Sequence, residues 1–310
     1  MQKYDLVIIG AGPAGAAAGV YAARKKLRTL LLTKDFLGQS AVSDKIYNWI
    51  GEVEISGIEL SKKFEQHLNY CRDQENSSLE IISGVIINSA RKDGDDFVIS
   101  DSKGTEYMAK NLLLCSGSSR KKLSVPGAEK YEHRGITYCA SCDGPLFADM
   151  DVAVIGGGNA GFETASQLLA YAKSVTLLHH RENFKADKIT IEKTLRNEKM
   201  TAIANAELTE VFGDNQVVGL RYFDNSLEKQ KEIAVQGIFV EIGHIPNTDI
   251  VRGLVDLDGH GKVVVDAWTM QTSQNGVWAS GDCSNVRYHQ NNIAAGDAVK
   301  AVENIYHSGY

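Results

Sequence analysis

Short runs of apolar residues alternate with longer helical stretches along this chain. Near the N-terminus, residues 6–9 and 30–32 are apolar runs, and the alanine-rich stretch between them predicts a helix ending near Lys26. The same order of strand, helix and strand recurs over residues 152–178. Buried strands that alternate with helices are typical of α/β proteins with parallel sheets. We therefore expect an α/β fold with two three-layer domains.

A glycine-rich segment separates strand from helix in both places. In such a spacing the first glycine permits a tight turn, the second lets the backbone approach a pyrophosphate, and the third allows close packing of helix on strand. The free N–H groups at the start of the helix then bind phosphate. Two copies predict two Rossmann-like nucleotide-binding domains. The first glycine turn contains Gly10, Gly12, Pro13, Ala14 and Gly15, and the second contains Gly156, Gly158, Asn159, Ala160 and Gly161.

Three further elements follow from the pattern. Residues 216–223 and 237–241 predict strands that complete the sheet of the second domain. The final helix is expected over about residues 292–306. Ser56 and Glu59 have the spacing of a capping box, so a helix should begin between them.

Composition and charge argue against nucleic-acid binding, membrane association and secretion. The 310 residues are 43% apolar and carry 33 basic and 39 acidic side chains, so no large positive field favours nucleic acid or an anionic membrane surface. Residues 6–23 carry no charge, but their glycines and their flanks, Asp5 before and Arg24 after, argue against a membrane span or a signal peptide. Five scattered cysteines favour a reducing compartment, so we expect a cytoplasmic protein.

Cys139 and Cys142 form the only Cys-x-x-Cys motif of the sequence. A zinc site would need two more ligands at matching spacing, which the sequence does not offer, and a structural disulfide does not suit a reducing compartment. A redox-active pair is the remaining interpretation, with one thiol pKa lowered by a helix that follows the pair. Asp143 could protonate a leaving thiolate, or it could simply cap a turn or helix.

The second strand of each domain is followed by residues that would meet the ribose of a nucleotide. In the second domain these are His180, Arg181 and Lys185, which suit the 2′-phosphate of NADPH, although an ordinary solvated charge cluster has the same composition. Nicotinamide delivers hydride, a dithiol takes up two electrons, and a flavin is the usual intermediary. We therefore expect FAD in the first site and NADPH, or NADH, in the second.

These motifs together resemble those of the low-molecular-weight thioredoxin reductase family, over nearly the whole chain. The resemblance rests on the two glycine turns, Gly38-Gln39, Asn48, residues 139–144 and residues 276–283. Residues 142–147, 185–187 and 245–247 look still more similar to the reductase half of the alkyl hydroperoxide reductase flavoprotein. That protein has an additional N-terminal thioredoxin-like module. Since this chain begins at the first glycine turn, any such relay is expected to be a separate protein.

The resemblance implies the pyridine nucleotide-disulfide oxidoreductase fold. Residues 1–116 and 247–310 would form a discontinuous FAD-binding domain, and residues 117–246 an inserted NAD(P)H-binding domain that carries the dithiol. Cys142 would face the flavin, Cys139 would attack the substrate disulfide, and Asp143 would be the acid. Further FAD contacts would be Gly38, Gln39, Asn48, Gly117, Gly281, Asp282, Gln290, Asn291 and Ala294. Gly243 would contact NAD(P)H.

The implied activity is that of an FAD-dependent thioredoxin-disulfide reductase, working as a homodimer on thioredoxin or a thioredoxin- or glutaredoxin-like protein. Three departures from the family pattern weaken the basic cluster for NADPH: His180, Lys185 and His289 stand where arginine is usual. They keep alternatives open. Ferredoxin could replace the nucleotide as donor, the enzyme could be a dithiol oxidase that uses O₂, or the chain could be a flavin-bound redox sensor without turnover.

Overall fold

The computed structural model describes residues 2–43 and 46–309, and the chain divides into two compact units. The terminal unit consists of Met1–Val42, Trp49–Ser119 and Ile245–Tyr310. The inserted unit consists of Ser43–Asn48 and Arg120–His244. The chain therefore crosses between the units after Ser119 and after His244, a few residues inside the boundaries expected from the sequence, and residues 43–48 group with the inserted unit rather than the terminal one.

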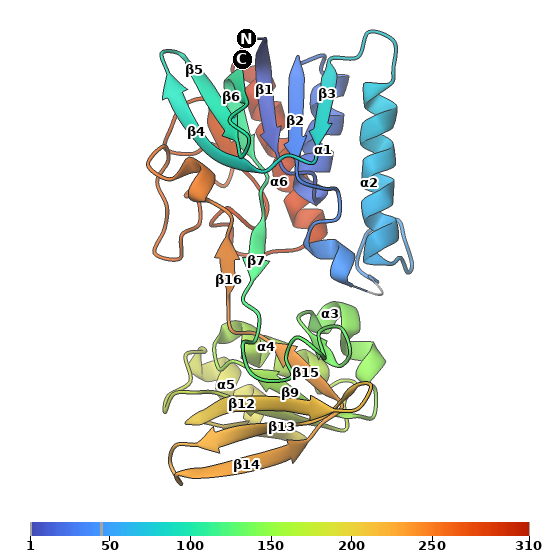
Figure 1. Cartoon of the computed structure of the whole chain (residues 1–310), viewed down its shortest axis with the longest axis vertical. Coiled ribbons are helices and arrows are strands. Elements are labelled where there is room, and N and C mark those ends of the chain that lie inside the picture. Colours follow the sequence, from blue (N-terminus) through green and yellow to red (C-terminus); the bar gives the residue numbers. More distant parts are fainter. Residues whose placement is uncertain (1, 44–45, 310) are drawn as a thin grey trace. The chain divides into compact units, whose positions relative to one another are not determined.

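The terminal unit contains one large sheet and the helices that cover it (Figure 1). Its strands are β1 (Lys3–Ile9), β2 (Thr29–Thr33), β3 (Leu79–Ser83), β4 (Ile87–Asp93), β5 (Asp96–Asp101), β6 (Glu106–Leu114) and β17 (Val277–Ala279). Its helices are α1 (Pro13–Arg24), α2 (Gly57–Arg72) and α6 (Asn291–His307), with short 3₁₀ turns η1 (Gln39–Val42) and η3 (Asp249–Val251). The strand order is β3-β2-β1-β6-β5-β4, and β17 pairs in parallel with β6.

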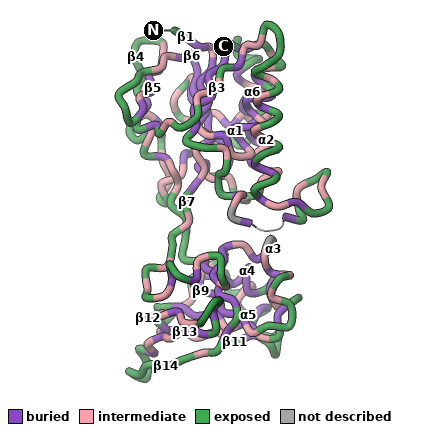
Figure 2. The backbone as a smooth tube through the Cα atoms, turned by 45° about the vertical axis from the view of Figure 1, so that its right-hand side comes forward, coloured by how far each residue is buried: buried purple, intermediate pink, exposed green. Residues whose placement is uncertain are grey.

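Side chains of β1 alternate between two cores, as the period of two in a strand requires. Leu6 and Ile8 pack with α1 and α6 on one face of the sheet, whereas Val7 and Ile9 pack on the other face with apolar residues of η3 and the loops that follow it. Both faces of β1 and β6 are therefore buried (Figure 2). This explains why residues 6–9 are uniformly apolar instead of alternating.

Helix α2 begins as the sequence predicts. The Ser56 hydroxyl accepts a hydrogen bond from the Glu59 N–H, and the Glu59 carboxylate accepts one from the Ser56 N–H, which completes a capping box. Leu60 and Leu68 lie on its buried side.

The inserted unit has a parallel sheet of strand order β11-β10-β9-β15-β8, whereas in the sheet of the terminal unit β5 pairs antiparallel with β4 and β6. These strands are β8 (Ile136–Thr137), β9 (Asp151–Ile155), β10 (Ser174–Leu178), β11 (Met200–Ile203) and β15 (Gly237–Val240). The remaining strands are β12 (Ala206–Gly213), β13 (Val217–Asp224) and β14 (Lys229–Ala234). The helices are α3 (Ala140–Asp143), α4 (Asn159–Leu168) and α5 (Lys188–Leu195), with the 3₁₀ turn η2 (Gly144–Phe147).

The expectation that residues 216–223 complete this sheet is wrong. Strand β13 pairs antiparallel with β12 and β14 in a separate three-stranded sheet, whereas β15 does join β9 and β8. Apolar residues of β12 and β13 pack on one face of the parallel sheet, and α4 packs on the other. The three layers are thus antiparallel sheet, parallel sheet and helices.

The two crossings of the chain are themselves paired strands. Strand β7 (Ser118–Arg120) pairs with β16 (His244–Pro246). At the terminal-unit end, the Asn247 side-chain amide donates to the Ser116 carbonyl at 2.8 Å, and the Ser116 hydroxyl donates back to the Asn247 carbonyl at 2.6 Å. These two hydrogen bonds join the segments next to β7 and β16 within the terminal unit.

None of the helices within residues 2–43 and 46–309 is both long and apolar enough to cross a membrane. The uncharged stretch 6–23, which has the length of a span, is instead divided into β1, a glycine turn and most of α1.

Replacing Phe239, in the middle layer of the inserted unit, tests this description of the core. Its ring is fully buried and packs edge-to-face on Phe147 with centroids 5.2 Å apart. Phe239→Ala is expected to destabilise the inserted unit by about 3–5 kcal/mol, because it removes apolar contacts and leaves a cavity. Thermal and urea unfolding measure the loss. Trp268→Ala is the control, since that side chain is 87% exposed and its loss should change stability by less than about 0.5 kcal/mol.

Candidate functional site

The first glycine turn joins β1 to α1. Gly10 has a φ of +103°, and its N–H donates to the Leu32 carbonyl at 2.8 Å. A Cβ atom at Gly15 would lie 1.8 Å from the Gly10 carbonyl oxygen, so only glycine allows the helix to start this close to the strand. A Cβ at Gly12 would have no described atom within 4 Å, which leaves its backbone open to a ligand. These features fit the pyrophosphate of a dinucleotide such as FAD.

Segments far apart in the sequence meet at this turn. A Cβ at Gly281, just after β17, would lie 3.4 Å from the Cβ atoms of both Ala14 and Ala294. A Cβ at Gly38 would lie 3.7 Å from the Gly12 Cα. Five residues assigned to one cofactor from the sequence are therefore neighbours in the structure.

Polar residues surround this point. The Ser118 hydroxyl donates to the Asp282 carboxylate at 3.4 Å, and His289 Nδ1 lies 3.3 Å from the same carboxylate. His289 Nε2 is 2.6 Å from the Lys262 ammonium, which has only donors. Nε2 therefore accepts from Lys262, and Nδ1 lies buried beside the Asp282 carboxylate without a hydrogen bond to it. The imidazole lies between Lys262 and the carboxylate that the resemblance assigns to the ribityl or ribose side of FAD.

The N-terminus of α6 is held to the loop after β2. Gln290 is its N-cap residue, and the Asn291 side-chain oxygen accepts from the Ser40 hydroxyl at 2.9 Å. Gln39, next to Ser40, begins η1. Asn48 belongs to the short segment that groups with the inserted unit, whereas the other predicted FAD contacts belong to the terminal unit.

The second glycine turn, between β9 and α4, repeats the first closely. Gly156 has a φ of +129°, and its N–H donates to the Leu178 carbonyl at 2.9 Å. A Cβ at Gly161 would lie 1.8 Å from the Gly156 carbonyl oxygen, and a Cβ at Gly158 would have no described atom within 4 Å. The turn thus provides a second place for a pyrophosphate.

Glu241 lies beside this turn, at the end of β15. A Cβ at Gly156 would lie 2.2 Å from the Glu241 carbonyl oxygen, so the turn packs directly on the end of this strand. The Glu241 carboxylate accepts a hydrogen bond from the Thr164 hydroxyl at 2.8 Å. Burial raises the pKa of Glu241, partly offset by this bond and by Arg120.

The basic residues predicted to meet the nucleotide ribose lie after β10. Arg181 and Lys185 are exposed, and the Arg181 Nε donates to His180 Nε2 at 3.1 Å. The loop thus offers the two cationic side chains of Arg181 and Lys185, with His180 hydrogen-bonded to the first of them. The Asn159 side chain is held against the end of this loop, because its oxygen accepts a hydrogen bond from the Asp187 N–H at 2.8 Å.

The last two glycines predicted to contact a cofactor lie next to the connecting strands β7 and β16. Both have a positive φ, +65° at Gly117 and +111° at Gly243. Gly117 accepts from the Asn247 N–H at 3.0 Å, and Gly243 accepts from the Lys121 N–H at the same distance. Both glycines are therefore explained at least in part by the backbone conformation that these positions require.

Cys139 is disulfide-bonded and precedes α3. The side chain of Cys142, its predicted partner, lies outside the described part of the structure. The helix expected after the pair differs from the prediction: α3 is only one turn long and begins between the two cysteines. Asp143 ends it, and its carboxylate accepts a hydrogen bond from the Thr137 hydroxyl on β8.

The thiols of Cys71, Cys115 and Cys283 are free. Burial raises the pKa of Cys283 to about 11 and raises that of Cys115 as well. A thiol that stays protonated reacts slowly, so these two buried residues do not form a second reactive dithiol.

A pyridine nucleotide-disulphide oxidoreductase family model matches residues 4–298. The chain belongs to this family. It is 38% identical over 301 residues to an alkyl hydroperoxide reductase component of Escherichia coli, a match that covers 97% of this chain and 57% of the relative. It is also 38% identical to thioredoxin reductase of Mycolicibacterium smegmatis, covering 96% and 94%. The chain thus spans little more than half of the first of these relatives.

Solved structures agree with the family assignment. Thioredoxin reductase from Streptococcus pyogenes superposes with a TM-score of 0.87 at 32% identity, covering 99% of both chains. Thioredoxin reductase from T. acidophilum gives 0.69 at 33% identity, covering 100% of this chain and 99% of the other. The predicted fold class is confirmed, and the expected cofactors, FAD and a nicotinamide nucleotide, are those of this oxidoreductase family.

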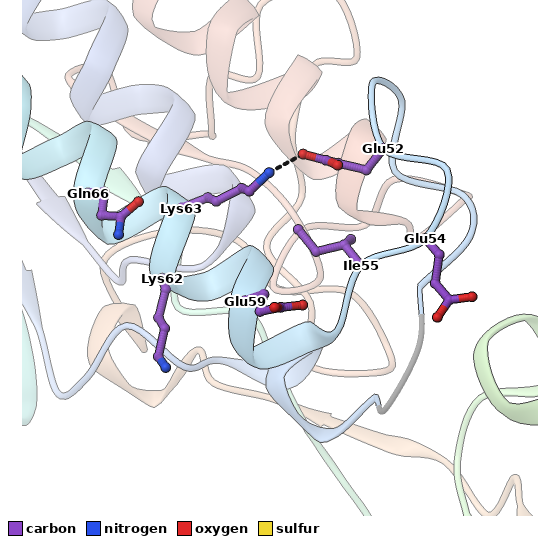
Figure 3. Close-up of a pocket in the computed structure, with 7 residues that line it drawn as sticks. All are labelled: Glu52, Glu54, Ile55, Glu59, Lys62, Lys63 and Gln66. Carbon is purple, nitrogen blue, oxygen red and sulfur yellow. Dashed lines mark hydrogen bonds and ion pairs between the residues drawn. The ribbon is translucent and has the colours of Figure 1, made fainter.

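This oxidoreductase also has a pocket around the start of α2 (Figure 3). None of the residues that line it was predicted to belong to the site. Its walls carry charges of both signs, including an ion pair between Lys63 and Glu52. It does not alter the assignment of the two glycine turns.

Two residues near the site were given no role from the sequence. Thr137 holds the carboxylate of Asp143, and His179 contacts the second glycine turn. The position of Thr137 shortly before the dithiol was the only available signal for its role. A buried histidine at a strand end carries no comparable signal, because its partners lie far away in the sequence.

Alanine at Gly12 and Gly15 should separate ligand binding from folding. Gly12→Ala meets no described neighbour, so the protein is expected to fold but to lose most of its FAD, because the new methyl occupies the pyrophosphate approach. Gly15→Ala collides with backbone and should lower the melting temperature as well. Flavin absorbance per protein and thermal unfolding distinguish the two. Full FAD retention by Gly12→Ala would contradict the placement of the cofactor.

Proposed function

We propose that this chain is an FAD-dependent disulfide reductase that passes electrons from a nicotinamide nucleotide to the disulfide of a small thioredoxin-like protein. The proposal assigns FAD to the first glycine turn and the nucleotide to the second. Its redox pair is Cys139 and Cys142. Overall, NAD(P)H, one proton and a protein disulfide give NAD(P)⁺ and a protein dithiol, so two electrons and all protons balance.

The observation that carries the proposal is the disulfide at Cys139 within the same unit as the second glycine turn. A zinc site or a structural thiol pair would leave the two glycine turns unexplained. A redox disulfide explains them together, because it needs both an electron donor and an intermediary.

When bound, a flavin accepts hydride from nicotinamide and transfers an electron pair to a disulfide. The residues of the chain do the rest. The turns at Gly12 and Gly158 leave backbone open for two pyrophosphates. On reduction the bond between Cys139 and Cys142 breaks, and Cys139 can attack a partner disulfide as a thiolate. The mixed disulfide is resolved when Cys142 attacks Cys139, which releases the partner as a dithiol.

Asp143 is proposed as the proton donor for the thiolate that leaves. Its carboxyl is held by the Thr137 hydroxyl, and Thr137 is anchored in β8 at the edge of the parallel sheet. The acid is therefore attached to the rigid sheet rather than to a loop, which favours a fixed geometry for proton transfer.

The donor is proposed to be NADPH, with NADH as the alternative. Arg181 and Lys185 are exposed after β10, where the ribose of a nucleotide is expected. His180 accepts a hydrogen bond from Arg181. Relatives of both kinds exist: some are named thioredoxin reductase, and one from Bacillus subtilis, 33% identical, is named NADH dehydrogenase.

We propose a thioredoxin- or glutaredoxin-like protein as the partner, a cytoplasmic location and a homodimer. The names of two matching relatives, one a thioredoxin reductase and the other a component of alkyl hydroperoxide reductase, support a disulfide or hydroperoxide-linked relay. Free thiols at Cys71, Cys115 and Cys283 suit a reducing compartment. Ferredoxin as the donor has less support, because the second glycine turn is intact.

The first test is anaerobic. NADPH and NADH are added separately to the flavin-loaded protein, and the visible flavin band is followed. Rapid bleaching by one nucleotide identifies the donor. A band that stays oxidised with both would contradict the proposal and point to ferredoxin. Reduction without turnover of any thioredoxin-like disulfide would instead indicate a redox sensor or a dithiol oxidase.

Serine at Cys142 tests the redox pair. Cys142→Ser is expected to retain flavin reduction by the nucleotide but to abolish turnover of a thioredoxin disulfide, because the electron pair has no disulfide to enter. Stopped-flow absorbance and a coupled dithiol assay measure the two steps. Cys71→Ser, which replaces a free thiol on α2, is the matched control and should behave like the unaltered protein. Normal turnover by Cys142→Ser would refute the assignment.

Glutamine at Arg181 tests how the donor is recognised. A charge-assisted bond to the 2′-phosphate is expected to contribute about tenfold or more to binding, so Arg181→Gln should raise the KM for NADPH by that factor. The KM for NADH should hardly change. Steady-state kinetics with both nucleotides give the comparison, with the exposed Lys229→Gln on β14 as the control. Equal effects on both nucleotides would mean that Arg181 does not read the phosphate.

A further inference from the structure

His179 follows β10 and is buried, with 4% of its surface exposed. Both ring nitrogens are used. Nε2 lies 3.1 Å from the Asn183 carbonyl oxygen, and Nδ1 accepts from the Gly157 N–H at 3.2 Å. A carbonyl oxygen can only accept, so Nε2 carries the proton and Nδ1 is left free to accept from Gly157. The ring is therefore a neutral imidazole in one defined tautomer.

Two further hydrogen bonds join the same segments. The Lys185 N–H donates to the Gly157 carbonyl at 2.7 Å, and the Asp187 N–H donates to the Asn159 side chain at 2.8 Å. Gly157 thus has its N–H and its carbonyl bonded to two ends of one loop. The loop that carries Arg181 and Lys185 and the turn that would receive the pyrophosphate are fixed to each other.

The fit around the ring is close. A Cβ at Gly157 would lie 2.6 Å from His179 Cγ and 2.8 Å from Phe184 Cδ1, so the turn rests directly on both rings. The rings of His179 and Phe184 are 5.6 Å apart and tilted by 33°, and Phe184 packs edge-to-face on Phe162 of α4. The imidazole is held in place by packing as well as by its hydrogen bonds.

The first glycine turn has no such arrangement. The N–H groups of Gly10 and Gly156 bond to Leu32 and Leu178, so Thr33 occupies the position that corresponds to His179. The Thr33 hydroxyl donates to the Asp35 carbonyl within its own loop. The histidine contact therefore belongs to the second turn and is not a general need of the fold.

Burial is the main reason that the ring is neutral. It lowers the pKa of His179, the hydrogen bond to the Asn183 carbonyl raises that pKa in part, and the nearby His180, Arg181 and Lys185 lower it again. Gly157 and the Phe184 ring, which pack against the imidazole, bring no charge. At neutral pH, Nδ1 is therefore available as an acceptor.

We propose that His179 is a positioning residue for the nicotinamide nucleotide: its Nδ1 acceptor holds Gly157 so that the second turn and its basic loop bind the pyrophosphate and ribose together. This inference rests on the proposed nucleotide site at the second turn. The acceptor at Nδ1, and not the ring as packing material, sets the affinity.

Asparagine and glutamine separate the two nitrogens. An asparagine oxygen can take the place of Nδ1, whereas a glutamine amide can take the place of Nε2. His179→Asn should bind nucleotide within about twofold of the unaltered protein. His179→Gln leaves the Gly157 N–H without its acceptor and should weaken binding roughly tenfold. Should the glutamine variant fail to fold, His179→Leu, which fills the volume without an acceptor, replaces it.

The measurement is calorimetric binding of ADP-ribose to the FAD-loaded protein, together with stopped-flow reduction of the flavin by NADH. ADP-ribose contains the pyrophosphate and both riboses but cannot transfer hydride. Weaker binding by the glutamine variant, with an unchanged flavin reduction rate at saturating NADH, supports the inference. His67→Gln on the exposed side of α2 is the control and should leave both values unchanged.

Two results would overturn the inference: asparagine and glutamine variants that bind as tightly as the unaltered protein, or variants that weaken equally. The second would mean that ring packing, not the Nδ1 acceptor, matters. Failure of the proposed function looks different, because then the unaltered protein itself would neither bind ADP-ribose nor be reduced by a nicotinamide nucleotide.

Discussion

In both units a helix starts so close to the preceding strand that no side chain fits between them. The contact is the same in each: a Cβ on the third glycine, Gly15 or Gly161, would lie 1.8 Å from the carbonyl oxygen of the first. This constraint places the N-terminus of α1 or α4 directly over the carboxyl ends of parallel strands. Free N–H groups at that end favour anions, so the binding of phosphate follows from how strand and helix pack.

What surrounds each turn decides what it can hold. At the first turn, the chain returns after more than two hundred residues to bring Gly281 against Ala14, with Ala294 also beside Gly281, and His289 lies between Lys262 and the carboxylate of Asp282. At the second turn, the neighbours are Glu241 and a loop with two exposed cations. Two nearly identical backbones thus acquire different polar surroundings.

Much of this could be read from the sequence because the signals are local. Each glycine turn lies between an apolar strand and a helix within about thirty residues, and the capping box at Ser56 and Glu59 spans four. Strand β13 was misplaced because an apolar run shows that a strand is buried but not which sheet it joins. The polar residues of β14, which include Lys229 and Lys231, show that this strand cannot be covered on both faces, and they were the missed signal.

The remaining errors have equally physical causes. The helix after Cys139 is cut to one turn because Gly144 and Pro145 follow and a 3₁₀ turn replaces it. The partners of His179 and Asn247 depend on tertiary contacts between loops, which no local pattern contains.

The route of the chain also determines the order in which the protein can be completed on the ribosome. Residues 120–244 emerge as nearly the whole of the inserted unit, and domains generally fold as units during synthesis. The terminal unit must wait, because β6 gains its neighbour β17 only at residue 277 and α1 gains its contacts with α6 only when residues 291–307 have been made. The middle of the chain can therefore reach its native state before the beginning does, and the part of α1 that packs on α6 stays uncovered in the nascent chain until α6 has been made.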